Sequence, residues 1–190
     1  MFKKLLDWDR ESFIYLNSLG IEQYDIFWST VTKISTWIPL FILFGVLFFK
    51  YYTKKQAFTI ILTVLLTVFF VVTLTDLTKE VVARLRPNND TEINTLIRIL
   101  RSPMGFSFFS GHASSSFCIT TMVFLFLKKH TKWAALFFVW PLLFSMSRIY
   151  VGVHFPIDLI VGALVGILAS CLFYAIYNRT ILPYLQSNHL

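Results

Sequence analysis

His154 and Asp158 are the pair of residues in this sequence whose types and spacing best suit catalysis. Pro156 stands between them, and proline is favoured in the first turn of a helix. Asp158 would then lie about one turn into that helix, close enough to reach back to His154. A carboxylate on one imidazole nitrogen fixes the tautomer and leaves the other nitrogen as a nucleophile. The pair therefore predicts nucleophilic catalysis, with Arg148 nearby at the end of the preceding apolar run.

A second group with chemical potential is Ser110-Gly111-His112, which directly precedes an apolar run. Ser110 is predicted to be the N-cap of a helix. Free backbone N–H groups at a helix N-terminus form an anion site, and Gly111 would let the backbone approach the ligand closely. His112 would lie at the rim of that site, where it could carry a proton. A structural role is the alternative for this histidine.

Lys79 and Arg86 supply positive charge before that group. They are seven residues apart, so the spacing predicts that they share one face of a helix that stops before Pro87. Two cations at a helix end suit an anion, and snorkelling to the membrane interface is the alternative. Asp76 and Glu80 flank Lys79, but no further acid or histidine completes a set of metal ligands. We therefore expect neither a metal nor another cofactor.

The composition indicates that these residues belong to a membrane protein. The chain of 190 residues is 56% hydrophobic, and only 14% of its residues are charged, whereas soluble domains usually have about a quarter. We expect an all-α, polytopic membrane bundle with five to six transmembrane helices. Five spans follow from the apolar runs, with approximate bounds 37–52, 57–77, 113–127, 133–146 and 157–177. A sixth span built from residues 12–34 is the alternative.

Two segments lie outside the spans. Residues 1–20 alternate charged and apolar side chains at helical spacing, which predicts an amphipathic helix in the membrane interface or packed on the rim of the protein. Residues 88–107 are expected to form a loop with a small helix, and loops of that length are often functional. The expected organisation is an N-terminal region over 1–35, a catalytic membrane domain over 36–180 and a tail over 181–190.

Lysines in two short turns predict the orientation. The turns hold Lys50, Lys54 and Lys55, and Lys128, Lys129 and Lys132. Because positive residues concentrate in cytoplasmic loops, the polar clusters between the other spans should face the outside. The short chain and its lysine-rich turns resemble those of bacterial membrane proteins. We therefore expect an inner-membrane protein whose site faces the periplasm. The net charge of +7 fits this topology and an anionic ligand, and we expect no nucleic acid partner.

In order, the motif residues are Lys79-x6-Arg86-Pro87, Ser110-Gly111-His112 and Ser147-Arg148-x5-His154-x3-Asp158. This pattern resembles the type 2 phosphatidic acid phosphatase (PAP2) family, in its branch of membrane lipid phosphatases. The superfamily also includes the vanadium haloperoxidases. The resemblance covers roughly residues 70–175 and departs at Phe109, where the family usually has proline.

The resemblance implies a metal-independent hydrolysis through a phosphohistidine. His154 would be the nucleophile, Asp158 its orienting partner and His112 the general acid. A clamp on the phosphoryl oxygens would comprise Lys79, Arg86, Arg148, Ser110 and the Gly111 amide. Because a phosphoryl transition state carries charge on its equatorial oxygens, fixed cations can replace the charge of a metal.

The expected substrate is a membrane lipid phosphate or pyrophosphate. Among the lipids that the resemblance implies, we favour undecaprenyl pyrophosphate or phosphatidylglycerol phosphate, with phosphatidic acid and lipid A phosphates as further options. Three other functions compete with this interpretation. They are a small transporter with an anion site, a lipid-binding protein without activity and a vanadate-dependent oxidase.

Overall fold

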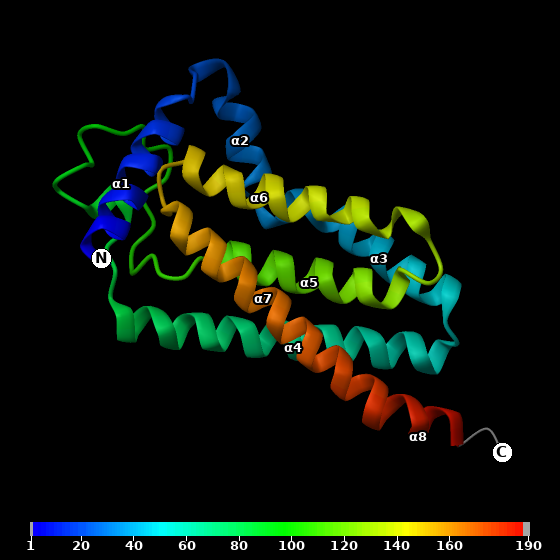
Figure 1. Ribbon diagram of the computed structural model, residues 1–190. Helices are drawn as coiled ribbons and strands as arrows, with labels where there is room; N and C mark the ends of the chain where they lie inside the picture. The colour runs from blue at the N-terminus through cyan, green and yellow to red at the C-terminus, as the bar shows by residue number, and fades with distance from the viewer. Residues whose placement is uncertain (1, 188–190) are drawn as a thin grey trace.

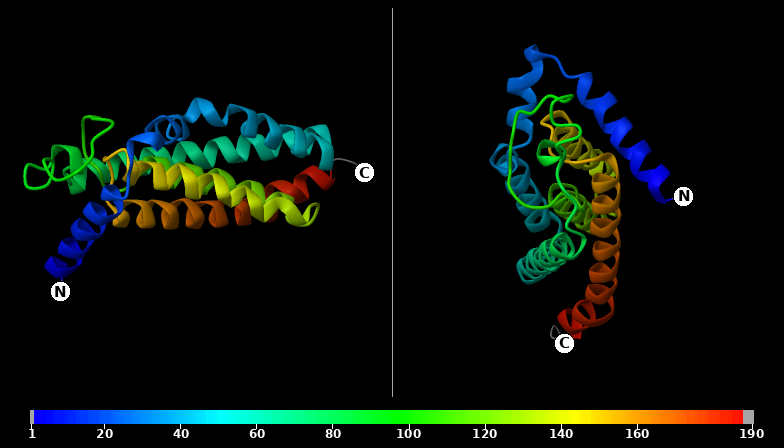
Figure 2. Two further views of the ribbon diagram at one scale, coloured as in Figure 1. Left: turned by 90° about the horizontal axis from the view of Figure 1, so that it is seen from above. Right: turned by 90° about the vertical axis from the view of Figure 1, so that its left-hand side faces the viewer.

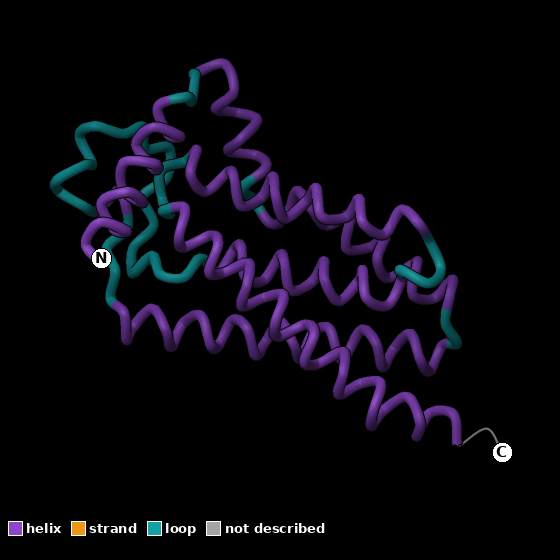
Figure 3. Tube along the Cα trace, viewed as in Figure 1, coloured by secondary structure: helices purple, strands orange, loops and turns teal. Residues whose placement is uncertain are grey.

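The computed structural model describes residues 2–187, and every regular element in that range is a helix (Figures 1 and 3). The α-helices are α1 (Phe2–Ser18), α2 (Asp25–Val31), α3 (Ile38–Tyr51), α4 (Lys54–Val82), α5 (Gly111–Leu127), α6 (Val139–Tyr150), α7 (Pro156–Ile176) and α8 (Leu182–Ser187). Short 3-10 helices precede α2, α3 and α6, and a π-helical turn joins α7 to α8. The all-α prediction is confirmed.

Four helical stretches are long and apolar enough to cross a membrane within the described range. They are Ile34–Tyr51, Lys54–Asn89, Lys132–Tyr150 and Pro156–Gln186. The apolar helix α5 is shorter, at 17 residues, and packs among them. These four stretches correspond to four of the five predicted spans, and the remaining predicted span, 113–127, corresponds to the shorter helix α5. Large apolar side chains remain exposed along these helices, which is expected where lipid rather than water surrounds them. The chain is an integral membrane protein.

Residues 12–34 do not form one long helix. The helix α1 ends at Ser18, a 3-10 turn spans Glu22–Tyr24, and α2 has only seven residues. This segment is therefore too broken to provide the alternative sixth span.

The helix α5 lies in the middle of the bundle and packs most closely on α7 (Figure 1). Small residues make that contact close. A Cβ atom added at Gly162 would lie 2.7 Å from the Ser110 carbonyl oxygen, and one at Gly166 would lie 2.2 Å from that of Ser114. One turn further, the Ser170 hydroxyl donates to the Cys118 carbonyl at 2.9 Å. Small residues at four-residue spacing allow two membrane helices to approach backbone to backbone.

The two ends of the bundle differ in what they carry. Figure 1 shows α1, the segment between α4 and α5, and the α6–α7 connection together at one end (left), and the first view of Figure 2 agrees. The lysine-rich turns after α3 and α5 lie at the other end, with α8. The two lysine-rich turns and the predicted site residues are therefore separated by the length of the bundle.

The helix α1 packs on the protein at the site end of the bundle and is inclined steeply to the long helices (Figure 2). Asp9, Phe13 and Asn17, at four-residue spacing, are all fully buried. Leu5, Trp8 and other apolar side chains of α1 remain exposed. The predicted alternative, a helix packed on the protein, is thus correct for the face with Asp9, Phe13 and Asn17. The rest of α1 exposes both apolar and charged side chains.

Two local predictions were wrong. The helix α4 ends at Val82, followed by Ala83 in the left-handed conformation (φ 50°), so Lys79 and Arg86 do not share a helix face. Contacts outside the helix compete for the segment, because the Ser107 amide donates to the Arg84 carbonyl at 2.8 Å. Within 88–107 there is no small α-helix. A 3-10 turn at Pro87–Asn89 is followed by turns and bends.

Candidate active site

The start of α7 positions the predicted pair of His154 and Asp158. Pro156 is the first residue of the helix, as expected, and Asp158 reaches back over that first turn. Its Oδ2 accepts the Phe155 amide at 3.0 Å and lies 3.4 Å from His154 Nδ1. Both side chains are almost fully buried. The carboxylate is thus fixed by the helix start and faces one nitrogen of the imidazole.

The other nitrogen of His154 faces a cation. Arg86 Nη1 lies 3.1 Å from Nε2 of His154 and also donates to the Val153 carbonyl at 3.3 Å. Because a guanidinium can only donate, Nε2 must carry the lone pair and Nδ1 the proton. This tautomer leaves Nε2 as the nucleophilic atom, beside the guanidinium.

Burial keeps this histidine uncharged. It lowers the pKa of His154 to about 4, in spite of the nearby Asp158 carboxylate, with Arg148 and Arg86 adding to the effect. His154 is therefore neutral at neutral pH, which is the form that can attack phosphorus.

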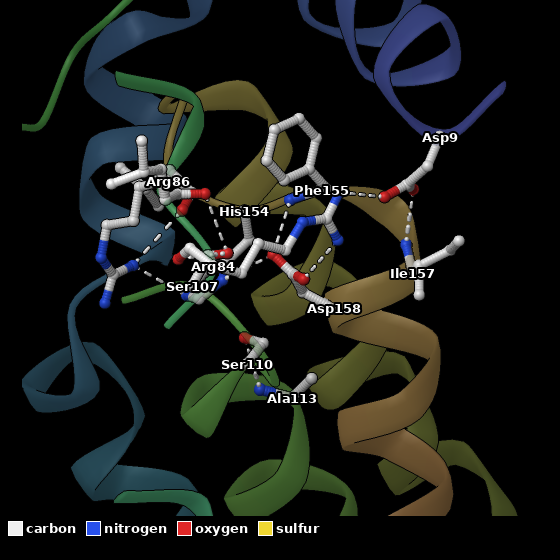
Figure 4. Close-up of polar contacts among 12 residues, drawn as sticks. Asp9, Arg84, Arg86, Ser107, Ser110, Ala113, His154, Phe155, Ile157 and Asp158 are labelled. Carbon is white, nitrogen blue, oxygen red and sulfur yellow. Dashed lines mark hydrogen bonds and ion pairs between the residues drawn. The ribbon is translucent and has the colours of Figure 1, made fainter. Parts of the chain in front are cut away.

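The start of α5 forms as predicted. Ser110 is its N-cap, with Oγ accepting the Ala113 amide at 3.4 Å, and the Ser110 amide donates to the Asp158 carbonyl at 3.0 Å (Figure 4). This bond ties the start of α5 to that of α7. The Lys79 ammonium lies beside Gly111, since a Cβ atom there would be 3.7 Å from Nζ. The helix N-terminus and a cation are thus adjacent, although Phe109 replaces the usual proline.

His112 lies among the cations. Its ring contacts Phe144 of α6 at 4.9 Å between centroids. Arg148, His154, Lys79 and Arg86 all interact electrostatically with it. The structure therefore brings together the residues that the sequence singled out, from α4, α5, α6, α7 and the two connections.

Two buried guanidiniums keep unpaired donors. Within residues 2–187, Nε of Arg86 and Nε of Arg148 are buried without a hydrogen-bond partner. Arg148 also donates to the hydroxyl of Thr32, at the end of α2. Unpaired donors on buried cations are costly. This arrangement suits an anion that accepts several hydrogen bonds.

Two residues that the sequence analysis did not assign complete the surroundings of Asp158. Arg84 donates to Asp158 Oδ1 at 2.8 Å and to Asp9 Oδ2 at 2.6 Å (Figure 4). Asp9 comes from α1, in a region without any motif residue. Burial raises the pKa of Asp9, and the hydrogen bonds from Ile157 and Arg84 act against that rise. The four-residue spacing of Asp9, Phe13 and Asn17 was the one available signal of this buried face.

The sequence and the fold are similar to those of known proteins. The family model described as the PAP2 superfamily matches residues 56–182. A lipid A 4'-phosphatase from Bacteroides thetaiotaomicron is 30% identical over 184 residues, covering 94% of this chain and 81% of the relative. An undecaprenyl-diphosphatase from Sulfolobus acidocaldarius is 33% identical over 142 residues, covering 74% of this chain and 63% of the relative.

A solved structure shares the fold. The crystal structure of a PAP2 type phosphatidylglycerolphosphate phosphatase from Bacillus subtilis superposes with a TM-score of 0.73 at 23% identity. The match covers 93% of this chain and 88% of the other. The family model spans most of the chain and includes every motif residue from Lys79 to Asp158. This chain therefore belongs to the PAP2 superfamily.

Proposed function

We propose that this PAP2 phosphatase hydrolyses a membrane lipid phosphate or pyrophosphate without a metal, through a phosphohistidine at His154. One observation carries the proposal. Nε2 of the buried, neutral His154 faces Arg86 at 3.1 Å while Nδ1 faces Asp158. A phosphoryl group bound by the guanidinium would lie next to the nucleophilic nitrogen, as proximity catalysis requires.

The other motif residues take their roles around this pair. Asp158 orients the imidazole, and His112 is the general acid. The phosphoryl oxygens are bound by Lys79, Arg86, Arg148, Ser110 and the Gly111 amide. The unpaired donors of Arg86 and Arg148 support this clamp. Ser110 uses its oxygen to cap α5, so its hydroxyl proton stays available for a phosphoryl oxygen.

The reaction has two steps. In the first, Nε2 of His154 forms a bond to phosphorus while the bond from phosphorus to the leaving oxygen breaks. The electron pair leaves with that oxygen, and His112 supplies its proton. In the second, His112 takes a proton from water, whose oxygen attacks phosphorus. The N–P bond breaks, its electrons return to Nε2, and inorganic phosphate is released.

A trapping experiment tests the mechanism. Purified protein quenched during turnover of a labelled lipid phosphate should carry an acid-labile, alkali-stable phosphoryl group on His154. The His154→Ala variant should carry none, and it should retain no more than a few per cent of activity.

Activity should survive EDTA, and vanadate should inhibit because its trigonal-bipyramidal form resembles the transition state. Turnover that EDTA abolishes and a divalent ion restores would contradict the mechanism.

For the substrate, we propose lipid A 4'-phosphate ahead of the two lipids that the sequence favoured. The lipid A relative aligns with most of both chains, which supports this order. Phosphate release should be measured with lipid A, undecaprenyl pyrophosphate, phosphatidylglycerol phosphate and phosphatidic acid at equal surface concentration. The natural substrate should have the highest kcat/KM. If another lipid of the panel gave the highest kcat/KM for phosphate release, that lipid would replace lipid A as the proposed substrate.

We also propose that the chain lies in a bacterial inner membrane with this site facing the periplasm. The separation of the lysine-rich turns from the site by the length of the bundle supports this orientation.

A further inference from the structure

Asp9 is a buried carboxylate on α1, far in sequence from every motif residue. It is fully inaccessible to solvent. Its Oδ1 accepts the Ile157 amide at 2.9 Å, and its Oδ2 accepts from Arg84 Nη2 at 2.6 Å (Figure 4). The carboxylate therefore satisfies a free amide in the first turn of α7, where a negative charge is also favourable. The other acids of α1, Asp7 and Glu11, are exposed.

Asp158 repeats this arrangement. Its Oδ2 accepts the Phe155 amide and faces His154, while its Oδ1 accepts from Arg84 Nη1 at 2.8 Å. One guanidinium thus bridges two fully buried carboxylates, with Nη1 donating to Asp158 and Nη2 donating to Asp9. Such a fork can hold both acids at once, whereas a lysine ammonium offers a single point of charge.

Arg84 is itself held in place. Its guanidinium carbon lies 4.0 Å from the centroid of the Phe155 ring, and Phe13 of α1 packs edge-to-face with the same ring at 5.3 Å between centroids. The Arg84 carbonyl accepts the Ser107 amide. The Arg84 side chain is therefore fixed by α1 and by the start of α7, and its backbone by the connection before α5.

We propose that Asp9 and Arg84 are positioning residues for His154, acting through Asp158. The inference rests on the proposed nucleophilic role of His154. Arg84 binds Oδ1 of Asp158, so that Oδ2 stays directed at Nδ1 of His154. Asp9 accepts a hydrogen bond from Nη2 of Arg84 and offsets the positive charge of the guanidinium. The helix α1, outside the matched family region 56–182, thereby completes the active site.

The charge of this group determines its effect on the reaction. With both acids ionised, the two carboxylates and the one guanidinium together carry one negative charge. When Nε2 bonds to phosphorus, the imidazole becomes positively charged while Nδ1 keeps its proton. A net negative group beside Nδ1 stabilises that charge. Without Asp9, Arg84 would neutralise Asp158, and the phosphorylated imidazole would lose this stabilisation.

The test compares Asp9→Asn with Glu11→Gln in the full-length protein. Both variants remove one negative charge from α1, but Glu11 is exposed. Asp9→Asn should lower kcat by about tenfold to a hundredfold, as removal of orienting partners commonly does, with KM unchanged within about twofold. Glu11→Gln should match the wild type. Equal kcat in the folded Asp9→Asn variant and the wild type would overturn the proposal.

A second comparison separates positioning from general loss of structure. In an Asp158→Asn background, measured on an activated aryl phosphate, Asp9→Asn should cause no further loss. The same fold-loss in both backgrounds would show that Asp9 does not act through Asp158.

If Asp9→Asn does not fold, Arg84→Lys replaces it, because a lysine keeps the charge but cannot bridge both acids. Wild-type kcat in that variant would overturn the proposal. An active His154→Ala variant would instead overturn the proposed function itself.

Discussion

His112 and His154 interact electrostatically with the same arginines but differ in their surroundings. His154 has a carboxylate on Nδ1 and a guanidinium at Nε2, and it is almost fully buried. His112 packs its ring against Phe144 and stays partly exposed at the start of α5. The first arrangement fixes one neutral tautomer. The second leaves the His112 imidazole partly exposed, with no carboxylate described against its ring.

This difference predicts that the His112→Ala variant is sensitive to the leaving group and that the His154→Ala variant is not. An alkoxide leaving from a lipid phosphate needs a proton in the transition state, whereas an activated phenolate needs much less help. His112→Ala should therefore nearly abolish lipid hydrolysis but retain appreciably more activity on an aryl phosphate. His154→Ala should be equally severe for both. Equal fractional losses for His112→Ala on the two substrates, at a chemistry-limited rate, would remove the general-acid role.

The charge state of His154 can be measured directly. With a pKa of about 4, the ring should stay neutral as the pH falls through 5.5, where a histidine with an ordinary pKa of about 6.5 would be about nine-tenths protonated. Spectra of 15N-histidine-labelled protein, assigned with His154→Ala, should show the Nδ1–H tautomer from pH 8 to pH 5.5. Protonation of this ring with a midpoint near 6.5 would contradict the assignment.

At the scale of helices, the contact between α5 and α7 holds the two halves of the site together. Ser110 caps α5 and bonds to the Asp158 carbonyl of α7, and Gly162 lies against the Ser110 carbonyl. Any movement of α5 along α7 would therefore change the position of His112 relative to His154.

Two glycines give a matched test of this contact. Gly166→Ala would put a Cβ atom 2.2 Å from the Ser114 carbonyl oxygen, whereas a Cβ atom at Gly45 of α3 meets nothing within 4 Å. Overpacking of this kind costs about 1–3 kcal/mol. Gly166→Ala should lower both the unfolding temperature and kcat. Gly45→Ala should leave kcat unchanged and, as alanine favours helix, not lower the unfolding temperature. Equal unfolding temperatures in the two variants would contradict the close contact.

Local features of the sequence predicted local structure well. Ser110 as an N-cap and Pro156 as a helix start depend on neighbours within one turn, and both were confirmed. The end of α4 was placed too late because contacts of the Arg84 segment with Ser107 compete with the helix. Asp9 was missed because its partner Arg84 is 75 residues away in the chain. Spacing within one segment carries no information on such pairs.

At the scale of the whole molecule, the orientation in the membrane can be tested from the two ends of the bundle. Lys54 lies at the lysine-rich end and Asn89 at the site end, and both are exposed. In a variant without native cysteines, an impermeant maleimide applied to outer-permeabilised cells should label Asn89→Cys but not Lys54→Cys. Labelling at position 54 but not at 89 would reverse the topology.

The two native cysteines have a consequence for measuring how the bundle opens. Cys171 is exposed on α7, whereas Cys118 is buried on α5 beside Val71 and Ala169. A thiol reagent that partitions into lipid would react with the first at once. It would reach the second only when α5 separates from α4 or from α7. The rate at which Cys118 is modified would therefore measure how often these helices separate in an intact bilayer, without an engineered label.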